Sequence, residues 1–326
     1  MAVYTEVTDE ALRAFLSDYA LGDLMAFRGI AEGVENSNYA LRTTAGDFVL
    51  TLYEKRVDPA ELPYFLGLMR HLAGQGLSCP LPVAGRDGEA LRQLAGRPAA
   101  ICTFLEGVWP RRVRPDHLAP LGEALARLHA AGQGFPEIRP NGLGPAQWAP
   151  LLDGCRAGGD AVQPGLVAEL DGHLAGILAA WPEAGRLPTG QIHADLFPDN
   201  VFFLPDAAGR PRVSGLIDFY FACTDLLAYD IAVCLNAWCF EPDGAFNATK
   251  ARALLAAYDA VRPLSAAERR ALPVLARGAA IRFLLTRLYD WTHTPEGALV
   301  TRKDPLEYLR KLRFFAASEG IDGLAR

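Results

Sequence analysis

Gln191-Ile-His-Ala-Asp-Leu-Phe-Pro-Asp-Asn200 lies past the midpoint of the chain, and Leu216-Ile-Asp-Phe-Tyr220 follows shortly after it. The first stretch has the form His-x-Asp-x-x-x-x-Asn, and the second is an apolar run that ends in Asp218. The apolar run has the composition of a β-strand, so Asp218 is expected at a strand end. A single Asp or Asn in a loop usually bonds nearby backbone groups. The combination of loop, spacing and strand-Asp favours a functional site instead.

The residue types in these stretches match the needs of phosphoryl transfer. Transfer from a nucleotide to a hydroxyl requires a carboxylate that accepts the hydroxyl proton, and oxygen ligands that hold Mg²⁺ on the phosphates. Asp195 fits the first role, and Asn200 with Asp218 fits the second. The separation between Asp195 and Asn200 equals that in the kinase catalytic loop, and His193 stands where that loop has its His. The sequence therefore predicts Asp195 as the proton acceptor and the other two as metal ligands.

The same residues resemble the aminoglycoside phosphotransferase-like branch of the kinase fold, whose loop usually reads His-Gly-Asp-x-x-x-x-Asn. The run from Asp225 to Ala232 also resembles that branch, and the wording from His193 to Phe203 is similar to its bacterial homoserine kinases. The resemblance covers almost the whole chain. It implies a two-lobe α+β fold of the protein-kinase type, with ATP and Mg²⁺ as cofactors. His193 and Asp230 are expected to support the catalytic loop.

Composition narrows the class of partner and the compartment. The 326 residues suffice for one large or two modest domains, and 51% hydrophobic residues allow a sizeable core. The net charge of −6 argues against nucleic acid or an anionic membrane as the main partner. The six cysteines lack metal-ligand spacing, which predicts buried thiols in a reducing compartment. No export signal or apolar span is evident, so we expect a cytoplasmic protein that binds a small molecule.

The N-terminal third has the pattern of an antiparallel sheet. A helix is expected from Thr8, which can cap it, with a stripe that extends to Tyr19. Five strands are expected, with a helix between the third and the fourth. The strands are predicted near 24–27, 38–42, 48–53, 90–94 and 99–104. Residues 1–104 are therefore predicted to form the nucleotide-binding lobe, and residues 105–326 the helical lobe for catalysis and substrate binding.

Nucleotide contacts are predicted in the connection after the first strand, on the third strand and in the hinge between the lobes. The connection from Gly29 to Asn38 has a glycine and small polar residues, which let backbone N–H groups approach phosphates. An ordinary hairpin has a similar composition, but the position in the lobe and the resemblance favour phosphate binding. Phe104 and Glu106 lie in the expected hinge, whose backbone contacts adenine in the resembling fold. The residues predicted to contact the phosphates in the connection are Gly33, Asn36, Ser37 and Asn38.

The third strand departs from the resembling fold. That fold places a Lys or Arg there to hold the phosphates, and the matching position here is Thr51. Lys55 would lie on the same strand face if the strand continued that far. Glu61 begins the next helix, where an acidic residue can simply favour the helix N-terminus. The group that replaces the usual Lys is left open.

The rest of the chain is predicted to be mainly helical. Helices are expected from Asp116, from Asp225 and at four further places, near 167–181, 245–258, 265–292 and 304–317. His129 near the end of the first of these is expected to interact with the helix dipole. A loop rich in Pro and Gly is expected at 135–145, and a hairpin at 201–218.

Polar residues inside one apolar helix form the predicted substrate site. The segment from Arg282 to Trp291 carries them three or four residues apart, so they can share a helix face. Such a face can be an internal ion-pair network or a substrate cradle, and the resemblance favours the cradle. Arg282 or Arg287 could bind a carboxylate, but five residues separate the two, so both are not expected in the cleft. Asp290 could bind an ammonium group, and Tyr289 or Asn236 could add a neutral hydrogen bond.

The predicted reaction is ATP-dependent phosphorylation of the side-chain hydroxyl of L-homoserine, a step of threonine biosynthesis. An aminoglycoside or choline-like amino alcohol is the alternative acceptor. A polycationic acceptor would favour a cleft crowded with carboxylates, whereas the helix from Arg282 to Asp290 offers both signs of charge. A nucleotide-binding module with weak activity is the alternative from another class, and Thr51 is the one residue that suggests it.

Overall fold

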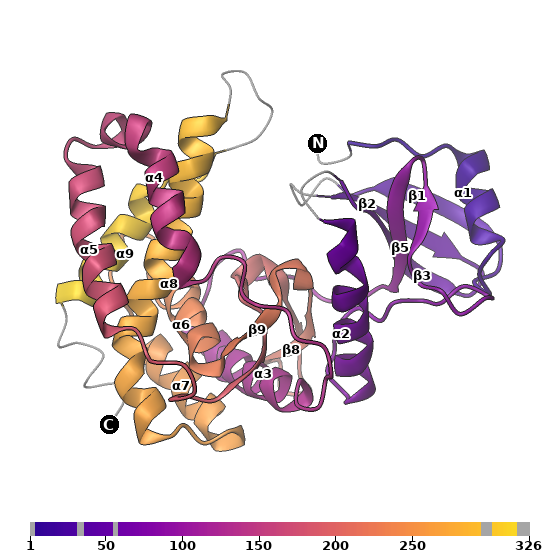
Figure 1. The fold of residues 1–326 in the computed structure, drawn as a ribbon. Coiled ribbons are helices and arrows are strands. Elements are labelled where there is room, and N and C mark those ends of the chain that lie inside the picture. Colours follow the sequence, from indigo (N-terminus) through magenta and orange to yellow (C-terminus); the bar gives the residue numbers. More distant parts are fainter. Residues whose placement is uncertain (1–3, 31–35, 55–57, 295–301, 318–326) are drawn as a thin grey trace.

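The structure is a computed structural model that describes residues 4–30, 36–54, 58–294 and 302–317. A sheet part built from the N-terminal third stands beside a larger helical part (Figure 1). The strands β1 (Leu24–Gly29), β2 (Ser37–Thr43), β3 (Gly46–Leu52), β4 (Arg92–Leu94) and β5 (Arg97–Thr103) form one antiparallel sheet. Its strand order is β1-β2-β3-β5-β4. The predicted five-stranded antiparallel sheet is thus confirmed.

The two faces of this sheet pack against different helices. Alternate residues of a strand point to opposite faces, and Ala99 and Ile101 of β5 join a core with α1 (Asp9–Leu16). Ala100 and Cys102 face the other way and join the core of α2 (Leu62–Gly74). The α2 core continues without a break into the helical part, so α2 ties the sheet to the rest of the molecule (Figure 1).

The first helix begins as predicted but ends earlier. The Thr8 hydroxyl accepts the Ala11 N–H at 3.2 Å, and Asp9 and Glu10 lie in the first turn, where acidic residues suit the helix dipole. The helix stops at Leu16, and Tyr19 is buried from the following turn. The predicted stripe was therefore wrong at Tyr19, because a turn can bury an aromatic ring at a helix-like spacing.

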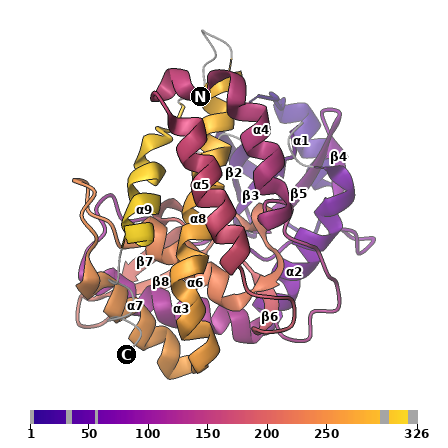
Figure 2. The same ribbon diagram turned by 60° about the vertical axis from the view of Figure 1, so that its left-hand side comes forward.

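The helical part is arranged around one long helix, α8 (Ala266–His293). It packs against α4 (Pro145–Val162), α5 (Leu166–Ala180), α6 (Leu227–Trp238) and α9 (Leu306–Ala317). Figure 2 shows α4, α5 and α9 gathered about it. The remaining helices, α3 (Leu118–Ala131) and α7 (Ala248–Val261), pack against each other. None of the helices in the described ranges is long and apolar enough to span a membrane.

The described segments outside the main sheet and the helices contain two short strand pairs and four 3₁₀ turns. β6 (Thr189–Ile192) pairs with β9 (Cys223–Leu226), and β7 (Val201–Pro205) pairs with β8 (Pro211–Leu216). The 3₁₀ turns are η1 (Pro59–Glu61), η2 (Pro115–His117), η3 (Pro198–Asn200) and η4 (Phe219–Phe221). Asp225 therefore lies in β9, and the helix predicted to begin there begins at Leu227. The pairing of Gly190 with Asp225 extends the strand past the residue where the helical pattern starts.

The sequence analysis missed α4 because its composition disfavours a helix. The helix contains Pro150 and several glycines, which lower helix propensity. The glycines serve packing instead. A Cβ at Gly154 would lie 3.2 Å from the Tyr289 ring, and one at Gly158 would lie 2.9 Å from Thr292 Cγ2, so small residues let α4 approach α8. All six cysteines are buried free thiols, as their spacing predicted.

Candidate active site

The loop from His193 to Asn200 connects β6 to β7, includes η3, and is hydrogen-bonded to a buried carboxylate. Asp230, on α6 and fully buried, accepts the N–H of His193 at 2.7 Å and that of Ala194 at 2.9 Å. His193 Nε2 donates to the Ile217 carbonyl at 2.9 Å. Ala194 has a positive φ of 62°, at the position where the resembling loops carry Gly. These bonds fix the backbone from which Asp195 projects.

A second layer fixes Asp230 itself. His129 Nε2 donates to Asp230 Oδ2 at 3.2 Å, and His129 Nδ1 accepts the Tyr258 hydroxyl at 2.7 Å. Burial alone would raise the pKa of Asp230. The hydrogen bonds from His129 and from the backbone N–H of His193 instead hold that pKa below its ordinary value. His129 was predicted to interact with the helix dipole. It instead belongs to this buried chain, because α3 places it beside α6.

Asp195 and Asn200 lie side by side with their oxygens available. Asn200 Nδ2 donates to the Asp195 carbonyl at 2.8 Å and lies 3.4 Å from Asp195 Oδ2. Because the amide nitrogen is used there, the amide oxygen of Asn200 is the atom left for a cation. The Asp195 side chain is 20% exposed, so a substrate hydroxyl can reach it.

The strand pair β7–β8 brings Asp218 to the same place. Val201 pairs with Leu216, and the Ile217 N–H donates to the Asn200 carbonyl at 3.0 Å. Asp218 follows directly, with φ at 65°. The amide oxygen of Asn200 and the carboxylate of Asp218 lie on adjacent segments of the chain. Both are hard oxygen donors of the kind that Mg²⁺ prefers, so this donor set fits the ion.

The predicted nucleotide contacts are partly engaged within the sheet. Gly33 and Lys55 lie outside the described residues. Asn36 Oδ1 accepts the Glu54 N–H at 3.2 Å, and the Ser37 hydroxyl donates to Glu54 Oε1 at 2.7 Å. The Thr51 hydroxyl donates to Asn38 Oδ1 at 2.7 Å across the β2–β3 pair. These hydrogen bonds stabilise the sheet, and they use the amide oxygens of Asn36 and Asn38 rather than the amide N–H groups.

The predicted hinge is pinned to the helical part. The Glu106 carbonyl accepts the Ser214 hydroxyl at 2.7 Å, and Val108 pairs with Phe203. Gly107 has a φ of 144°, and a Cβ there would collide with the Ser214 side chain. Phe104 is exposed at the start of this segment. The backbone of residues 104–106 thus stands at the junction between the sheet and the helices.

Of the predicted substrate residues, only Arg282 is brought to Asp195. The Arg282 guanidinium is buried over the Phe283 ring, 3.8 Å from its centroid, and Nη1 lies 3.4 Å from Asp195 Oδ1. Arg287 instead donates to Glu307 Oε2 at 2.7 Å and stacks on Tyr308. Five residues turn a helix by about 140°, so the two arginines leave α8 on different faces.

The other three substrate predictions find different surroundings. Asn236 is fully buried, and its amide donates to the carbonyls of Ala232 and Ala276 at 3.0 Å, so its amide nitrogen bonds α6 to α8. Burial between two helices argues against the predicted contact with substrate. Tyr289 stacks on His293, and Asp290 is exposed. Asp290 lies about 12 Å beyond Arg282 along the helix axis, at about 1.5 Å per residue.

Comparison with known proteins decides the family. The model of the family described as "Phosphotransferase enzyme family" matches residues 26–264. The chain belongs to this family. The homoserine kinase of Gluconacetobacter diazotrophicus is 70% identical over 98% of both chains. The homoserine kinase of Acidiphilium cryptum is 69% identical over 96% of both chains.

A solved structure shows the same fold at low identity. The amicoumacin kinase hAmiN, in complex with AMP-PNP, Ca²⁺ and Ami, superimposes with a TM-score of 0.70. The match covers 96% of the present chain and 94% of that chain, with 13% sequence identity. At this identity the likeness concerns the fold alone, and it confirms the predicted kinase-like two-lobe architecture of this phosphotransferase.

The phosphotransferase has a cavity beside Asp195 that the sequence analysis did not find. Its volume is about 360 Å³, and Ala194 and Arg282 lie in its wall. The other charged residues that line it are Glu61 of η1 and Arg139 of the loop after α3. Arg139 had no sequence signal, because its partner Glu61 is far away in the chain and both occur in ordinary contexts for surface residues.

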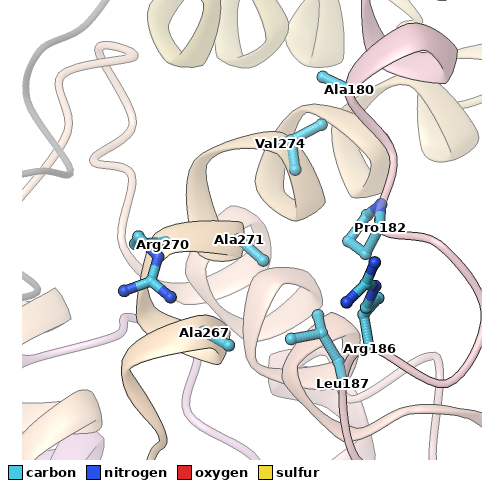
Figure 3. A pocket seen from close by; sticks show the side chains of 8 residues that line it. All are labelled: Ala180, Pro182, Arg186, Leu187, Ala267, Arg270, Ala271 and Val274. Carbon is cyan, nitrogen blue, oxygen red and sulfur yellow. The ribbon is translucent and has the colours of Figure 1, made fainter.

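A larger hollow of about 530 Å³ lies elsewhere in the phosphotransferase, between the end of α5 and the start of α8 (Figure 3). Its wall consists of Ala, Val, Leu and Pro side chains with Arg186 and Arg270 at the rim. Both arginines are exposed, and none of the predicted catalytic residues lines this hollow. Ala194 and Arg282, which adjoin Asp195, instead line the smaller cavity.

Proposed function

We propose that this phosphotransferase transfers the γ-phosphate of ATP to the side-chain hydroxyl of L-homoserine. The observation that carries the proposal is the 70% identity to a homoserine kinase over 98% of both chains. At such similarity along the whole length, the residues of the cavity and of the catalytic loop fall within the matched part. The substrate-side geometry agrees, because a cation, Arg282, stands beside the proton acceptor.

The catalytic loop supplies the groups that the transfer needs. Asp195 orients the homoserine hydroxyl and accepts its proton; its side chain is 20% exposed, and the neighbouring Ala194 lines the cavity. Asn200 and Asp218 hold Mg²⁺, which offsets the negative charge of the phosphates when it is bound. His193 and Asp230 position the loop through the bonds at 2.9 and 2.7 Å described above.

The first lobe, residues 1–104, binds the nucleotide in this proposal. The connection that includes Gly33, Asn36 and Asn38 covers the phosphates, because its glycine and small polar residues let N–H groups approach them. The hinge backbone between Phe104 and Glu106 contacts the adenine edge. Lys55 remains a candidate for the phosphate-binding cation, because Thr51 cannot supply a charge. Residues 105–326 supply the catalytic groups and the acceptor site.

A panel of acceptors tests the proposal. The purified protein is incubated with Mg-ATP and either L-homoserine, L-serine, choline, methylthioribose or kanamycin, and ADP release is followed by a coupled assay. We expect the highest kcat/KM with L-homoserine. L-Serine is one methylene shorter, and a misplacement near 1 Å can cost about 10²-fold in rate. Equal or better turnover of serine, choline or kanamycin would refute the homoserine assignment.

A further inference from the structure

The cavity beside Asp195 carries charges of both signs on two parts of the molecule. Glu61 comes from the sheet part, whereas Arg139 and Arg282 come from the helical part. Ala194, directly before the proton acceptor, and Arg282, 3.4 Å from Asp195 Oδ1, both line the cavity, so it lies beside the proposed site of phosphoryl transfer. Phe65 and Phe221 supply apolar walls between the charged groups. A small acceptor could lie here with its hydroxyl toward Asp195.

Arg139 is held in place but is not saturated. Its Nε and Nη2 donate to the two carboxylate oxygens of Glu61 at 3.0 and 2.8 Å, and its Nη1 donates to the Ala222 carbonyl at 3.2 Å. A guanidinium has five N–H donors, so partners within the described ranges use three of them and leave two. The side chain is 18% exposed, and its guanidinium lies 4.9 Å from the Phe65 ring centroid. Arg139 is therefore a positioned cation with N–H donors available for a ligand.

Glu61 also keeps bonding capacity. Each of its carboxylate oxygens accepts one bond from Arg139, and a carboxylate offers about four acceptor sites. The side chain is 39% exposed, so a cationic group could reach the remaining positions. Glu61 and Arg139 therefore form a pair whose two charges are both accessible from the cavity.

We propose that this cavity binds the charged head group of a small hydroxy-amino acid, with Arg139 on the carboxylate and Glu61 on the ammonium. The assignment rests on the proposed homoserine kinase function and adds the residues that select the substrate. Arg282 supplies a second cation near the carboxylate. The volume of about 360 Å³ leaves room for a small amino acid. Two arginines in the wall also disfavour a polycation.

Acceptors that lack one charge provide the test. L-Homoserine has both charges, 3-amino-1-propanol lacks the carboxylate, and 4-hydroxybutyrate lacks the ammonium. For each compound kcat/KM is measured, or its inhibition constant against homoserine where it is not phosphorylated. In Arg139→Gln we expect homoserine and 4-hydroxybutyrate to lose about 10²-fold, because their carboxylate loses a charged hydrogen-bond partner. 3-Amino-1-propanol should change by less than about threefold.

Glu61→Gln should show the opposite selectivity. Homoserine and 3-amino-1-propanol should lose affinity, whereas 4-hydroxybutyrate should be nearly unaffected. A purely structural ion pair is lost equally in either variant, so it predicts the same loss for all three compounds in both variants. That unselective outcome would overturn the assignment. The KM for ATP should stay within about threefold of the wild-type value in both variants, as expected for lost acceptor binding.

Arg313→Gln is the matched control. Arg313 donates to both carboxylate oxygens of Glu169 at 2.6 and 2.7 Å, the same two-bond geometry as in the Arg139–Glu61 pair, but it joins α9 to α5 far from the cavity. Its loss should leave all three compounds unchanged. Gly142→Leu gives a test that keeps the ion pair, because a Cβ at Gly142 has no atom within 4 Å and Gly142 lines the cavity. It should weaken binding of all three compounds while the KM for ATP is retained.

The two proposals fail in different ways. Wild-type turnover of homoserine with unselective losses in Arg139→Gln and Glu61→Gln would overturn the pocket assignment and leave the proposed function intact. Unchanged homoserine kinetics in Gly142→Leu would also overturn the assignment. Absence of homoserine turnover by the wild-type protein would overturn the proposed function and the assignment with it.

Discussion

Two residues of the proposed catalytic site have a strained backbone. Ala194 and Asp218 have φ of 62° and 65°, in the left-handed region that costs a residue with a Cβ about 1–2 kcal/mol. Both strained positions adjoin groups with a proposed chemical role, and such strain persists only where surrounding bonds enforce it. At Ala194 the enforcing bond is the one from its N–H to Asp230 at 2.9 Å.

Ala194→Gly should therefore stabilise the protein, because glycine adopts positive φ without the Cβ penalty. We expect the free energy of unfolding to rise by about 0.5–1 kcal/mol, since the greater freedom of glycine in the unfolded chain offsets part of the relief. Urea denaturation measures the change. Ala95→Gly, at φ 50° in the β4–β5 turn, is the control away from the site and should behave alike. A loss of stability in Ala194→Gly would contradict this account of the loop.

The proximity of Asp195, Asn200 and Asp218 could be predicted from sequence because its signal is local. Asp195 and Asn200 lie in one short loop, and Asp218 follows a strand that begins soon afterwards. Arg139 could not be found in this way, since its significance depends on Glu61, 78 residues earlier in the chain. Arg287 shared the polar pattern of Arg282 but contacts Glu307 on α9, and Asn236, on another helix, lies in the α6–α8 contact. A pattern of spacing cannot say which face of a buried helix meets the site.

Among the helices, α8 and α9 are joined by a charged cluster of Arg287, Glu307 and Lys311. Glu307 accepts hydrogen bonds from Arg287 at 2.7 Å and from Lys311 at 2.6 Å. Burial alone would raise the pKa of Glu307, but the nearby Lys311 charge and these hydrogen bonds lower it to about 2. Because the folded-state pKa is depressed, the cluster stabilises the fold above the ordinary pKa of a Glu side chain. That contribution is lost as the pH falls toward about 2.

Glu307→Gln should flatten the acid limb of the stability profile. At pH 7 we expect a loss of about 1 kcal/mol, since the partly exposed carboxylate is screened by solvent. Between pH 5 and pH 2 the difference from wild type should shrink, because the wild-type carboxyl becomes protonated. Denaturant titrations across this pH range measure both values, and Glu183→Gln, in an exposed pair with Arg186, is the control. A difference that stayed constant with pH would contradict the assigned pKa.

Element prediction succeeded where pattern and packing agree and failed where packing overrode propensity. The long helix α8 was predicted within one residue of its bounds, because Ser265 caps it and its apolar spacing is regular. The helix α4 was missed, since the glycines that let it approach Tyr289 and Thr292 disfavour a helix in isolation. The strand β9 was missed because its partner β6 lies more than 30 residues earlier.

At the scale of the whole molecule, the two lobes are connected through polar bonds as well as through the α2 core. The hydroxyl of Tyr53 in the first lobe lies 3.0 Å from the hydroxyl of Tyr220 in the second lobe. Tyr220 comes two residues after Asp218. The Glu61–Arg139 pair crosses the same junction. The two-lobe fold was predicted from the antiparallel pattern of the first third of the chain. These contacts could not be predicted, because they join segments that are distant in sequence. Nucleotide and metal binding at this junction should therefore stabilise the molecule as a whole.

Mg-ATP should raise the unfolding temperature of the wild-type protein, and the increase should depend on Asp218. At 100 times Kd a ligand that binds only the folded state adds about 2.7 kcal/mol. Asp218→Ala removes an anionic metal ligand, so the increase should largely vanish, and turnover should be abolished. Thermal unfolding with and without Mg-ATP measures this. Asp199 is an exposed carboxylate in the His193–Asn200 loop, and Asp199→Ala should keep the full increase. An increase in Asp218→Ala equal to that of the wild type would refute the metal assignment.

The most direct measurement is the identification of the product by ³¹P–¹H NMR, with wild-type protein, Asp195→Asn and Asp199→Asn compared. With Mg-ATP and L-homoserine the wild type should form one phosphomonoester, coupled to the side-chain CH₂ protons, in equal amount to ADP. Asp195→Asn should form the same product with kcat lower by about 10²–10⁴, because the proton acceptor is lost. Asp199→Asn should match the wild type. No phosphorylated homoserine from the wild type, or an Asp195→Asn variant that keeps most of its kcat, would contradict the account.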